Sequence, residues 1–415
     1  MSVSLKVPYW RLSGFYGLYF ALIGCIMPFW GLYLQQQDFD VSDIGILLAF
    51  FSAVRIFAPN IWASISHLLE SIISPIQLLR LGGVMMIVCF SAIYWATEFW
   101  HYAIIMLAYG FFWSAILPQY ETLTLNHINN DLDSYSSIRL WGSIGFIVVV
   151  SLLGWAFDLI SLNYLPGIML VLMVGIALNS FTLVAPPQKP NESTLDYDCE
   201  NESNIEQDES LSVSGFIQSK GYFNWGLISF LVINVLVQIT HGPYYVFFSI
   251  YLQQLDYSHW MIGLFWSLGV FSEIIIFWKI ALFIKRWSLR ELVILCLVLT
   301  AVRWLLTAYF AEIGVILILS QCLHAFSFGL LHVISVKYIA IFYPGKQQLH
   351  GQALYSGLGF GLGGALGAYF AGLSWAAYGP VWVFVAAAAI ALIAAVIAYY
   401  GLPRENKMSE AQSHC

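Results

Sequence analysis

Three ionisable side chains, Glu273, Arg303 and His324, each lie near the middle of an apolar run in the second half of the chain. If these runs are helices that rise about 1.5 Å per residue, Glu273 and Arg303 lie roughly 20 Å along them. That depth is near the centre of a hydrocarbon layer about 30 Å thick. Ionisable groups at such a depth face protein or water and mark functional sites. The spacing therefore predicts a polar, protonatable site between three helices.

A carboxylate, a guanidinium and an imidazole at similar depth suit proton-coupled transport. Glu273 can bind and release a proton, and His324 can pass one on because an unperturbed imidazole titrates near neutral pH. Arg303 can pair with Glu273 or with an anionic substrate, so we expect the carboxylate and the substrate to compete for it. The alternative is a structural ion pair that only fixes the packing of the helices.

Further polar residues inside or at the ends of apolar runs are candidates for substrate binding. Arg55 stands out because no other Lys or Arg lies well inside an apolar run of the first half. Its guanidinium fork can bind two carboxylate oxygens, or it can steady the bundle through a carboxylate or a backbone carbonyl. The full set of candidates is Arg55, Glu121, Arg139, Gln238, His241, Tyr245 and His332.

Glu121 and Arg139 are 18 positions apart, at the ends of two runs joined by a short loop. The loop makes the two helices antiparallel neighbours, so the two side chains can meet. They can contact the substrate, or they can form an interfacial ion pair worth about 0–1 kcal/mol if it is exposed.

Gln238 and His241 are three residues apart and share a helix face, and the nearby Tyr244 and Tyr245 can line an aromatic pocket. They can bind substrate or form hydrogen bonds between helices. His332 follows His324 by eight residues, which is roughly 80° around a helix with 3.6 residues per turn. Neither histidine spacing is typical of a metal pair, and no phosphate-binding or hydrolase motif is present. We therefore expect no metal, no cofactor and no enzymatic activity.

The composition requires a membrane environment. The chain has 415 residues, of which 60% are hydrophobic and 9% are charged, whereas soluble globular proteins carry about 25% charged residues. We place twelve helical spans, because the runs are of helical length and lack the alternation of strands. The spans lie at about 9–34, 42–65, 74–96, 100–120, 138–158, 164–184, 223–252, 259–283, 291–310, 313–336, 351–374 and 379–401.

A polar segment divides these spans into six and six. It is rich in Asn, Glu, Ser and Asp, a composition typical of disorder. Loops after the odd-numbered spans contain no Lys or Arg, so the positive-inside rule makes both termini cytoplasmic. We therefore predict a six-helix bundle at 1–185, a disordered cytoplasmic linker at 186–220, a second bundle at 221–402 and a cytoplasmic tail at 403–415.

The two halves have similar sequences at corresponding positions. Leu32-Tyr33-Leu34-Gln35-Gln36 ends the first span, and Ile250-Tyr251-Leu252-Gln253-Gln254 ends the seventh. This weak internal symmetry between parallel halves is expected of a duplicated six-helix unit. The sequence thus predicts an all-α membrane protein with twelve transmembrane helices in two pseudo-symmetric six-helix bundles.

Local motifs resemble one branch of a known family. They are Arg139-Leu140-Trp141-Gly142-Ser143-Ile144-Gly145, His241-Gly242-Pro243-Tyr244-Tyr245, Trp266-Ser267-Leu268-Gly269-Val270 with Glu273, Val302-Arg303-Trp304, and Leu323-His324-Ala325-Phe326. Together they resemble the phenylpropionic acid transporter branch of the major facilitator superfamily, which is itself similar to lactose permease-type proton symporters. The lactose permease type uses an acid and an Arg for substrate at the places of Glu121 and Arg139. It also has a carboxylate where this chain has Ser327.

The resemblance implies a multi-pass secondary transporter of the bacterial inner membrane. We expect proton-coupled import of a small organic acid, a class that includes aromatic acids such as 3-phenylpropionate, by a chain that functions as a monomer. The expected partners are the substrate, the proton and the lipid bilayer, and no nucleic acid. The alternatives are a proton-coupled sugar or nucleoside symporter, a drug effluxer, and a non-transporting membrane receptor.

Overall fold

The computed structural model describes residues 7–69, 72–128, 131–183 and 221–403. These residues form helices and no strand. The predicted linker at 186–220, nearly all of the predicted tail at 403–415 and the first six residues lie outside the described ranges. The domain boundaries placed there stay predictions.

The described helices of the first half precede residue 184, and those of the second half follow residue 220. Those of the first half are α1 (Tyr9–Cys25), α2 (Gly31–Gln36), α3 (Val41–Ala53), α4 (Ala58–Leu68), α5 (Pro75–Ser91), α6 (Phe99–His127), α7 (Leu132–Phe157) and α8 (Leu165–Thr182). Those of the second half are α10 (Gly221–Gln254), α11 (His259–Arg286), α12 (Leu289–Phe310), α13 (Gly314–Cys322), α14 (Leu331–Phe342), α15 (Gln348–Ser356) and α16 (Gly364–Gly401).

Eleven helical segments of the described chain are long and apolar enough to cross a membrane. The last of them, His350–Gly401, is 52 residues long, which is about 78 Å at 1.5 Å per residue and far more than one crossing needs. It is interrupted at Gly379, whose φ of 79° and ψ of 173° are not helical, and Pro380 follows. This segment therefore comprises two spans, in agreement with the prediction of twelve.

The second predicted span, 42–65, is not one continuous α-helix. It is divided into α3 and α4 by a 3₁₀ turn, Val54–Ile56, which holds Arg55. Pro59 explains the break, because a proline ring clashes with the carbonyl four residues earlier and has no N–H to bond to it. The break places Arg55 at a turn in the middle of the span.

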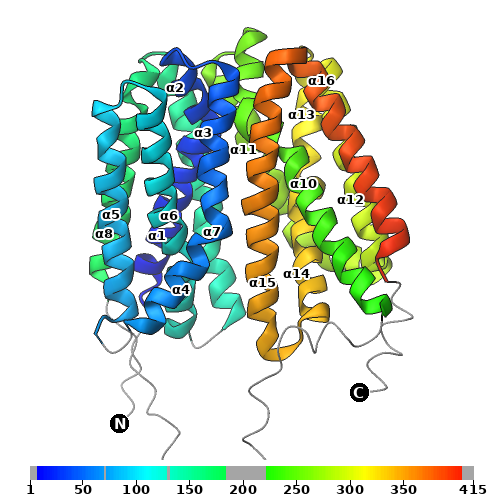
Figure 1. Ribbon diagram of the computed structural model, residues 1–415, viewed down its shortest axis with the longest axis horizontal. Helices are drawn as coiled ribbons and strands as arrows, with labels where there is room; N and C mark the ends of the chain where they lie inside the picture. Colours follow the sequence, from blue (N-terminus) through cyan, green and yellow to red (C-terminus); the bar gives the residue numbers. More distant parts are fainter. Residues whose placement is uncertain (1–6, 70–71, 129–130, 184–220, 404–415) are drawn as a thin grey trace, which may run out of the picture.

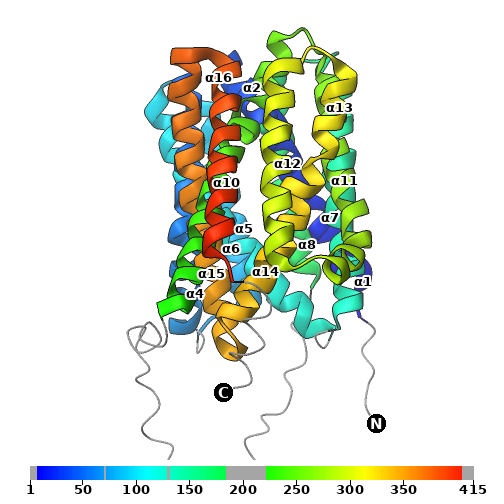
Figure 2. The same ribbon diagram turned by 90° about the vertical axis from the view of Figure 1, so that its right-hand side faces the viewer.

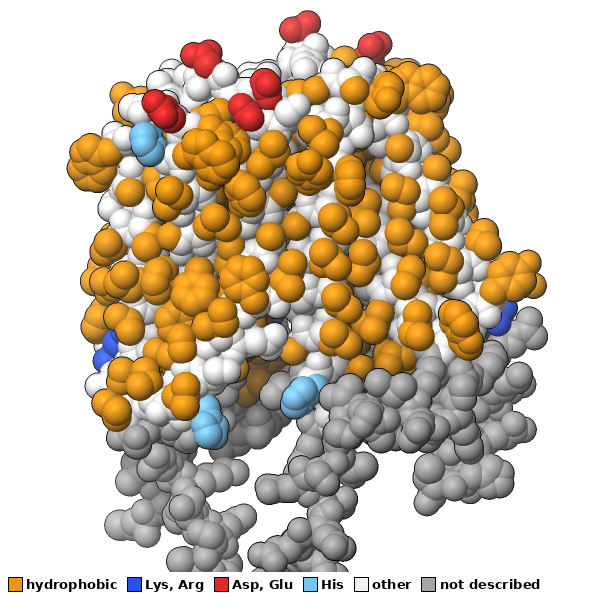
Figure 3. Space-filling view, in the orientation of Figure 1, with side chains coloured by type: hydrophobic (Ala, Val, Ile, Leu, Met, Phe, Trp, Pro, Cys, Tyr) orange, Lys and Arg blue, Asp and Glu red, His pale blue; other side chains and the backbone are white. Residues whose placement is uncertain are grey.

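The two halves of the chain form two groups of helices side by side (Figures 1 and 2). They meet where α3 packs against α16 and where α7 packs against α11. Helix α1 begins and α16 ends at the same end of the molecule (Figure 1). Figure 3 shows hydrophobic side chains over most of one face of the molecule. Acidic side chains gather at the end away from the start of α1.

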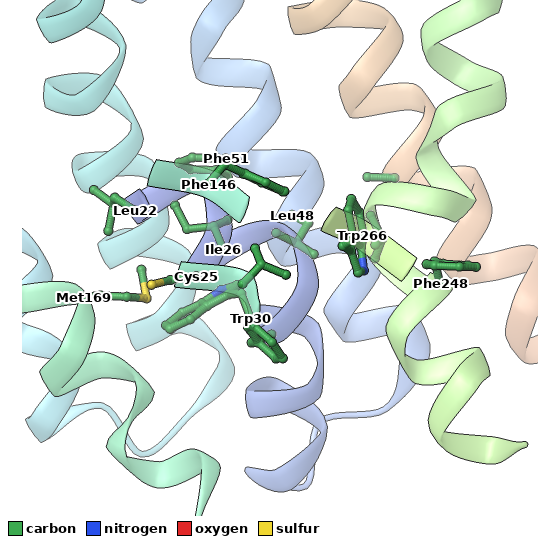
Figure 4. Close-up of a cluster of buried hydrophobic side chains, with 14 of the residues drawn as sticks. Leu22, Cys25, Ile26, Trp30, Leu48, Phe51, Phe146, Met169, Phe248 and Trp266 are labelled. Carbon is green, nitrogen blue, oxygen red and sulfur yellow. The ribbon is translucent and has the colours of Figure 1, made fainter. Parts of the chain in front are cut away.

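The core is built largely from aromatic and long apolar side chains. Between α1 and α8, Cys25 and Met169 point toward each other (Figure 4) and are buried. In the second half, Phe248 of α10 contacts Trp266 of α11, with ring centroids 5.9 Å apart. These clusters hold the helices that carry the polar residues described below.

The two halves touch closely at the acidic end. A Cβ atom on Gly45 of α3 would lie 2.8 Å from Cα of Gly372 in α16, so only glycine permits this approach. Asp158, at the end of α7, accepts hydrogen bonds from the backbone N–H groups of His259 (2.8 Å) and Trp260 (3.1 Å). A carboxylate from one half thus caps the first turn of α11 in the other half, and this end is closed.

Candidate functional site

A cavity of about 1070 Å³ lies between the two halves. It is lined from both halves, and its walls include Ser136 and Ser137 at the start of α7, which are exposed. Tyr9, the first residue of α1, donates a hydrogen bond to the backbone oxygen of Ser137 (3.4 Å). The cavity therefore reaches the end of the molecule where α1 begins, opposite the closed end.

Most of the predicted site residues meet in this cavity. Those that line it are Arg55, Glu121, Arg139, Gln238, Tyr245, Glu273, His324 and His332. Two others, Arg303 and His241, lie behind the wall with no exposed surface. The structure thus brings residues from positions 55 to 332 to one chamber, which sequence spacing alone does not establish.

Glu273, His324 and Arg303 form a chain of contacts. Nε2 of His324 lies 2.8 Å from Oε1 of Glu273, and Nη1 of Arg303 lies 2.8 Å from Nδ1 of His324. Since a guanidinium only donates hydrogen bonds, Nδ1 of His324 must accept, and the neutral ring carries its proton on Nε2. That proton then points at a Glu273 carboxylate oxygen, which suits the ionised form of the acid.

Arg303 makes no direct ion pair with Glu273 among the described residues. We expected Glu273 and the substrate to compete for it, but in the structure it reaches Glu273 only through His324. Its Nη1 also donates to Ser327 Oγ (2.9 Å) and its Nη2 to Gln321 Oε1 (3.4 Å). The contact to Ser327 occupies the place where lactose permease-type proteins have a carboxylate. In this conformation Arg303 is therefore fully buried against His324 and does not line the cavity.

Gln321 is a site residue that sequence reasoning missed. Its Oε1 accepts from Tyr244 Oη at 3.0 Å as well as from Arg303. The Tyr244 ring also lies against the guanidinium, whose Cζ is 4.2 Å from the ring centroid. The sequence did not identify Gln321, because a neutral amide in an apolar run has many structural uses. Its contact with Arg303 is what assigns it to the site.

Arg55 is a half-buried cation in the first-half wall. Its Cζ lies 4.8 Å from the ring centroid of Trp113 and 5.3 Å from that of Phe51. Among the described residues, the ion pairs are His259 with Asp158 and His324 with Glu273, so Arg55 has no carboxylate partner there. Aromatic faces hold its side chain, and its N–H groups remain available to a ligand.

Glu121 and Arg139 both line the cavity, but they are not within ion-pair distance of each other in the described chain. Glu121 Oε1 accepts a hydrogen bond from Tyr135 Oη at 3.2 Å. Arg139 stacks on Phe20, with Cζ 3.9 Å from the ring centroid. The predicted direct pair does not form. Each side chain has an aromatic partner of its own, and α7 packs mainly against α1 and α11 rather than against α6.

Gln238 and His241, three residues apart on α10, differ in their access to the cavity. Gln238 and Tyr245 line the cavity, whereas His241 is fully buried. Its Nδ1 lies 2.8 Å from the backbone oxygen of Val237, and its ring meets Trp304 edge-on at 5.1 Å. In this conformation His241 therefore lies behind the cavity wall, packed against α12.

The chain matches one family along most of its length. The model of the MFS_1 like family matches residues 9–386. The chain belongs to this family. Members of this family are transporters and not enzymes, so this major facilitator-type chain is a multi-pass membrane transporter of small molecules.

Two curated relatives are of similar length. The probable 3-phenylpropionic acid transporter of Escherichia coli (strain K12) is 27% identical over 381 residues, which cover 90% of this chain and 93% of that protein. The maltose permease of Geobacillus stearothermophilus is 25% identical over 353 residues, which cover 84% of this chain and 83% of that protein.

Solved structures share the fold. The nucleoside transporter NupG matches with a TM-score of 0.76 and 17% identity, covering 95% of this chain and 98% of that one. A D-xylose-proton symporter matches with a TM-score of 0.69 and 12% identity, covering 94% and 97%. At these identities the likeness concerns the fold alone.

Proposed function

We propose that this MFS_1 like transporter imports a small organic acid together with a proton across the bacterial inner membrane. The substrate class that we favour is an aromatic carboxylic acid such as 3-phenylpropionate. The observation that carries this proposal is Arg55, a cation in the cavity wall without a carboxylate partner among the described residues.

The chemistry of Arg55 favours an anion. A guanidinium presents a planar fork of donors that matches the two oxygens of a carboxylate. The Trp113 and Phe51 rings hold this fork without neutralising it. A neutral substrate that displaced water from the cavity would leave this charge uncompensated, which is unfavourable in a low-dielectric site.

The cavity wall favours an aromatic body on that anion. Besides Phe51 it includes Phe20, Tyr245, Trp266 and Phe328. Flat rings of this kind stack with a substrate ring at centroid distances of about 4.5–7 Å. The likeness to the probable 3-phenylpropionic acid transporter of Escherichia coli supports the same substrate class.

We further propose that the open end of the cavity faces the cytoplasm. The acidic end shown in Figure 3 would then face outward, as expected from the positive-inside rule. Import would proceed by rocking of the two halves about the cavity, with the glycine contacts and the Asp158 cap separating at the outer end.

The test is uptake of radiolabelled 3-phenylpropionate by proteoliposomes under an imposed inward proton gradient. We expect accumulation by the wild type. Arg55→Gln should weaken apparent substrate affinity roughly 10- to 100-fold, the equivalent of losing about 1.5–3 kcal/mol of charge-assisted hydrogen bonding.

Arg290→Gln is the matched control, because Arg290 also stacks on a ring, with Cζ 4.9 Å from the Tyr399 centroid, but does not line the cavity. Equal affinity in the wild type and Arg55→Gln would reject an anion held by Arg55.

A second candidate is symport of a neutral hydroxylated substrate such as a sugar or nucleoside. It is favoured by Glu121 and Gln238, whose polar groups line the cavity and can accept from hydroxyls. The same proteoliposomes assayed with maltose, xylose and nucleosides distinguish the two candidates. Gradient-driven uptake of one of these, without uptake of aromatic acids, would support the second.

A further inference from the structure

A π-helical turn, Ala325–Leu330, follows His324 and precedes α14. In such a turn, residues five apart come into register, so His324 and Gly329 share one face. Glu273 packs on Gly329, because a Cβ atom added to Gly329 would lie 3.3 Å from Cγ of Glu273. His332 lies three residues further, one turn along the same helix face. Glu273 thus packs on a helix face that carries an imidazole on each side of Gly329, at His324 and His332.

Three rings form a column in the cavity wall. The His324 and Phe328 rings lie 5.5 Å apart at 10°, and the Phe328 and His332 rings lie 6.0 Å apart at 5°. All three residues line the cavity. Because Phe328 separates the two imidazoles, a proton cannot pass directly from one to the other. The neighbouring carboxylate of Glu273 is the group that can reach both.

His332 is oriented by a neutral partner. Its Nδ1 lies 2.8 Å from Oη of Tyr355 in α15. When Nδ1–H donates to that oxygen, Nε2 keeps a free lone pair. The ionisable groups around His332 are Glu273 of α11, Tyr355 of α15 and, from the opposite wall of the cavity, Arg139 of α7. Among these, Glu273 can act as a proton donor to Nε2.

We propose that His332 accepts the transported proton from Glu273 and passes it to the cytoplasmic side; this rests on the proton symport proposed above. Protonation of Glu273 removes the charge from its bond with His324 Nε2–H, and the side chain rotates past Gly329. Its O–H bond then breaks as an N–H bond forms at Nε2 of His332. The imidazolium releases that proton to water in the cavity, and the carboxylate returns to His324.

This role differs from the substrate contact predicted from the sequence. A substrate ligand contributes to binding whether or not a proton moves. A proton acceptor contributes only to steps in which the proton leaves, and general-base groups contribute roughly 10²–10⁴-fold to such steps. Gradient-driven uptake and substrate exchange therefore separate the two roles, because exchange needs no net proton release.

The experiment measures both activities in proteoliposomes for His332→Asn. We expect gradient-driven uptake of 3-phenylpropionate to fall about 100-fold, with exchange within about twofold of the wild type. Exchange also reports that the variant is folded. His350→Asn, the same change at an exposed histidine of α15, is the matched control and should leave both activities unchanged.

Tyr355→Phe provides the second variant, because it keeps the ring and removes the oxygen that orients His332. We expect a smaller loss of uptake and a changed dependence of uptake on lumenal pH, which a packing defect would not produce. If His332→Asn takes up substrate at the wild-type rate, or loses uptake and exchange equally, the proposed role of His332 is wrong. Either result would leave the proposed transport function standing. A wild type that accumulates no acid under a proton gradient would overturn the proposed function, and the role of His332 with it.

Discussion

The imidazole of His324 lies between the Glu273 carboxylate and the Arg303 guanidinium, with contacts of 2.8 Å on both sides. Arg303 therefore acts on the Glu273 carboxylate through His324, because it fixes the tautomer of that imidazole. This arrangement joins α11, α12 and the π-helical turn before α14 through one hydrogen-bonded chain. A change of charge at Glu273 alters the contact that ties α11 to the rest of the second half.

Replacement of Glu273 by Gln should separate accumulation from exchange. The amide keeps the shape of the side chain but cannot bind or release a proton, so the variant should fail to accumulate substrate under a proton gradient while still exchanging it. Uptake and exchange in proteoliposomes measure this, with Glu312→Gln at an exposed acid as the control. Unchanged accumulation would exclude Glu273 as the proton carrier.

Replacement of Arg303 by Lys should impair transport although the charge is kept. A lysine ammonium cannot reproduce the fork that donates to His324, Ser327 and Gln321 together. Loss of one such charge-assisted bond, about 1.5–3 kcal/mol, should lower uptake roughly 10- to 100-fold. The measurement is the initial uptake rate beside that of Arg290→Lys. Similar rates in the two variants would contradict the supporting role of Arg303.

A methyl group at Gly329 should disturb the Glu273 side chain. The Cβ atom of alanine would lie 3.1 Å from Cγ2 of Ile276 and 3.3 Å from Cγ of Glu273. We expect Gly329→Ala to lower gradient-driven uptake more than exchange. Gly83→Ala is the matched control, because there the added atom meets its nearest neighbour, Cβ of Ala177, at an ordinary 3.7 Å. Equal effects of the two substitutions would show that the contact at Gly329 is not functional.

Loss of the carboxylate at Asp158 should weaken the closed end. An N-terminal cap contributes about 0.5–2 kcal/mol, so Asp158→Ala should favour opening roughly 2- to 30-fold. Ser151 lies at the same interface, 3.1 Å from Ser267 across the halves. In a chain whose native cysteines are replaced, Ser151→Cys should react faster with an impermeant maleimide when Asp158→Ala is present. Glu312→Ala should leave the rate unchanged, and an unchanged rate in Asp158→Ala would argue against the cap.

Hydropathy and the placement of charges were enough to predict the helical membrane fold, and eight of the ten residues that they predicted for a site line the cavity. A polar side chain in a long apolar run has few acceptable environments, so the sequence alone predicts Glu273, His324 and Arg55 at a cavity. Hydropathy is a property of each segment alone. The number of helical spans therefore followed from it, including the two spans that Gly379 and Pro380 separate.

The contacts between polar groups, in contrast, emerge only from the packed helices. Arg303 and His241 have the same sequence signature as the cavity residues, yet both are fully buried behind the wall. The order of contacts from Arg303 through His324 to Glu273 depends on how three helices rotate and on a π-helical turn that shifts the register. Helix rotation and register are set by side-chain packing between segments far apart in the chain, so no local pattern in the sequence encodes them.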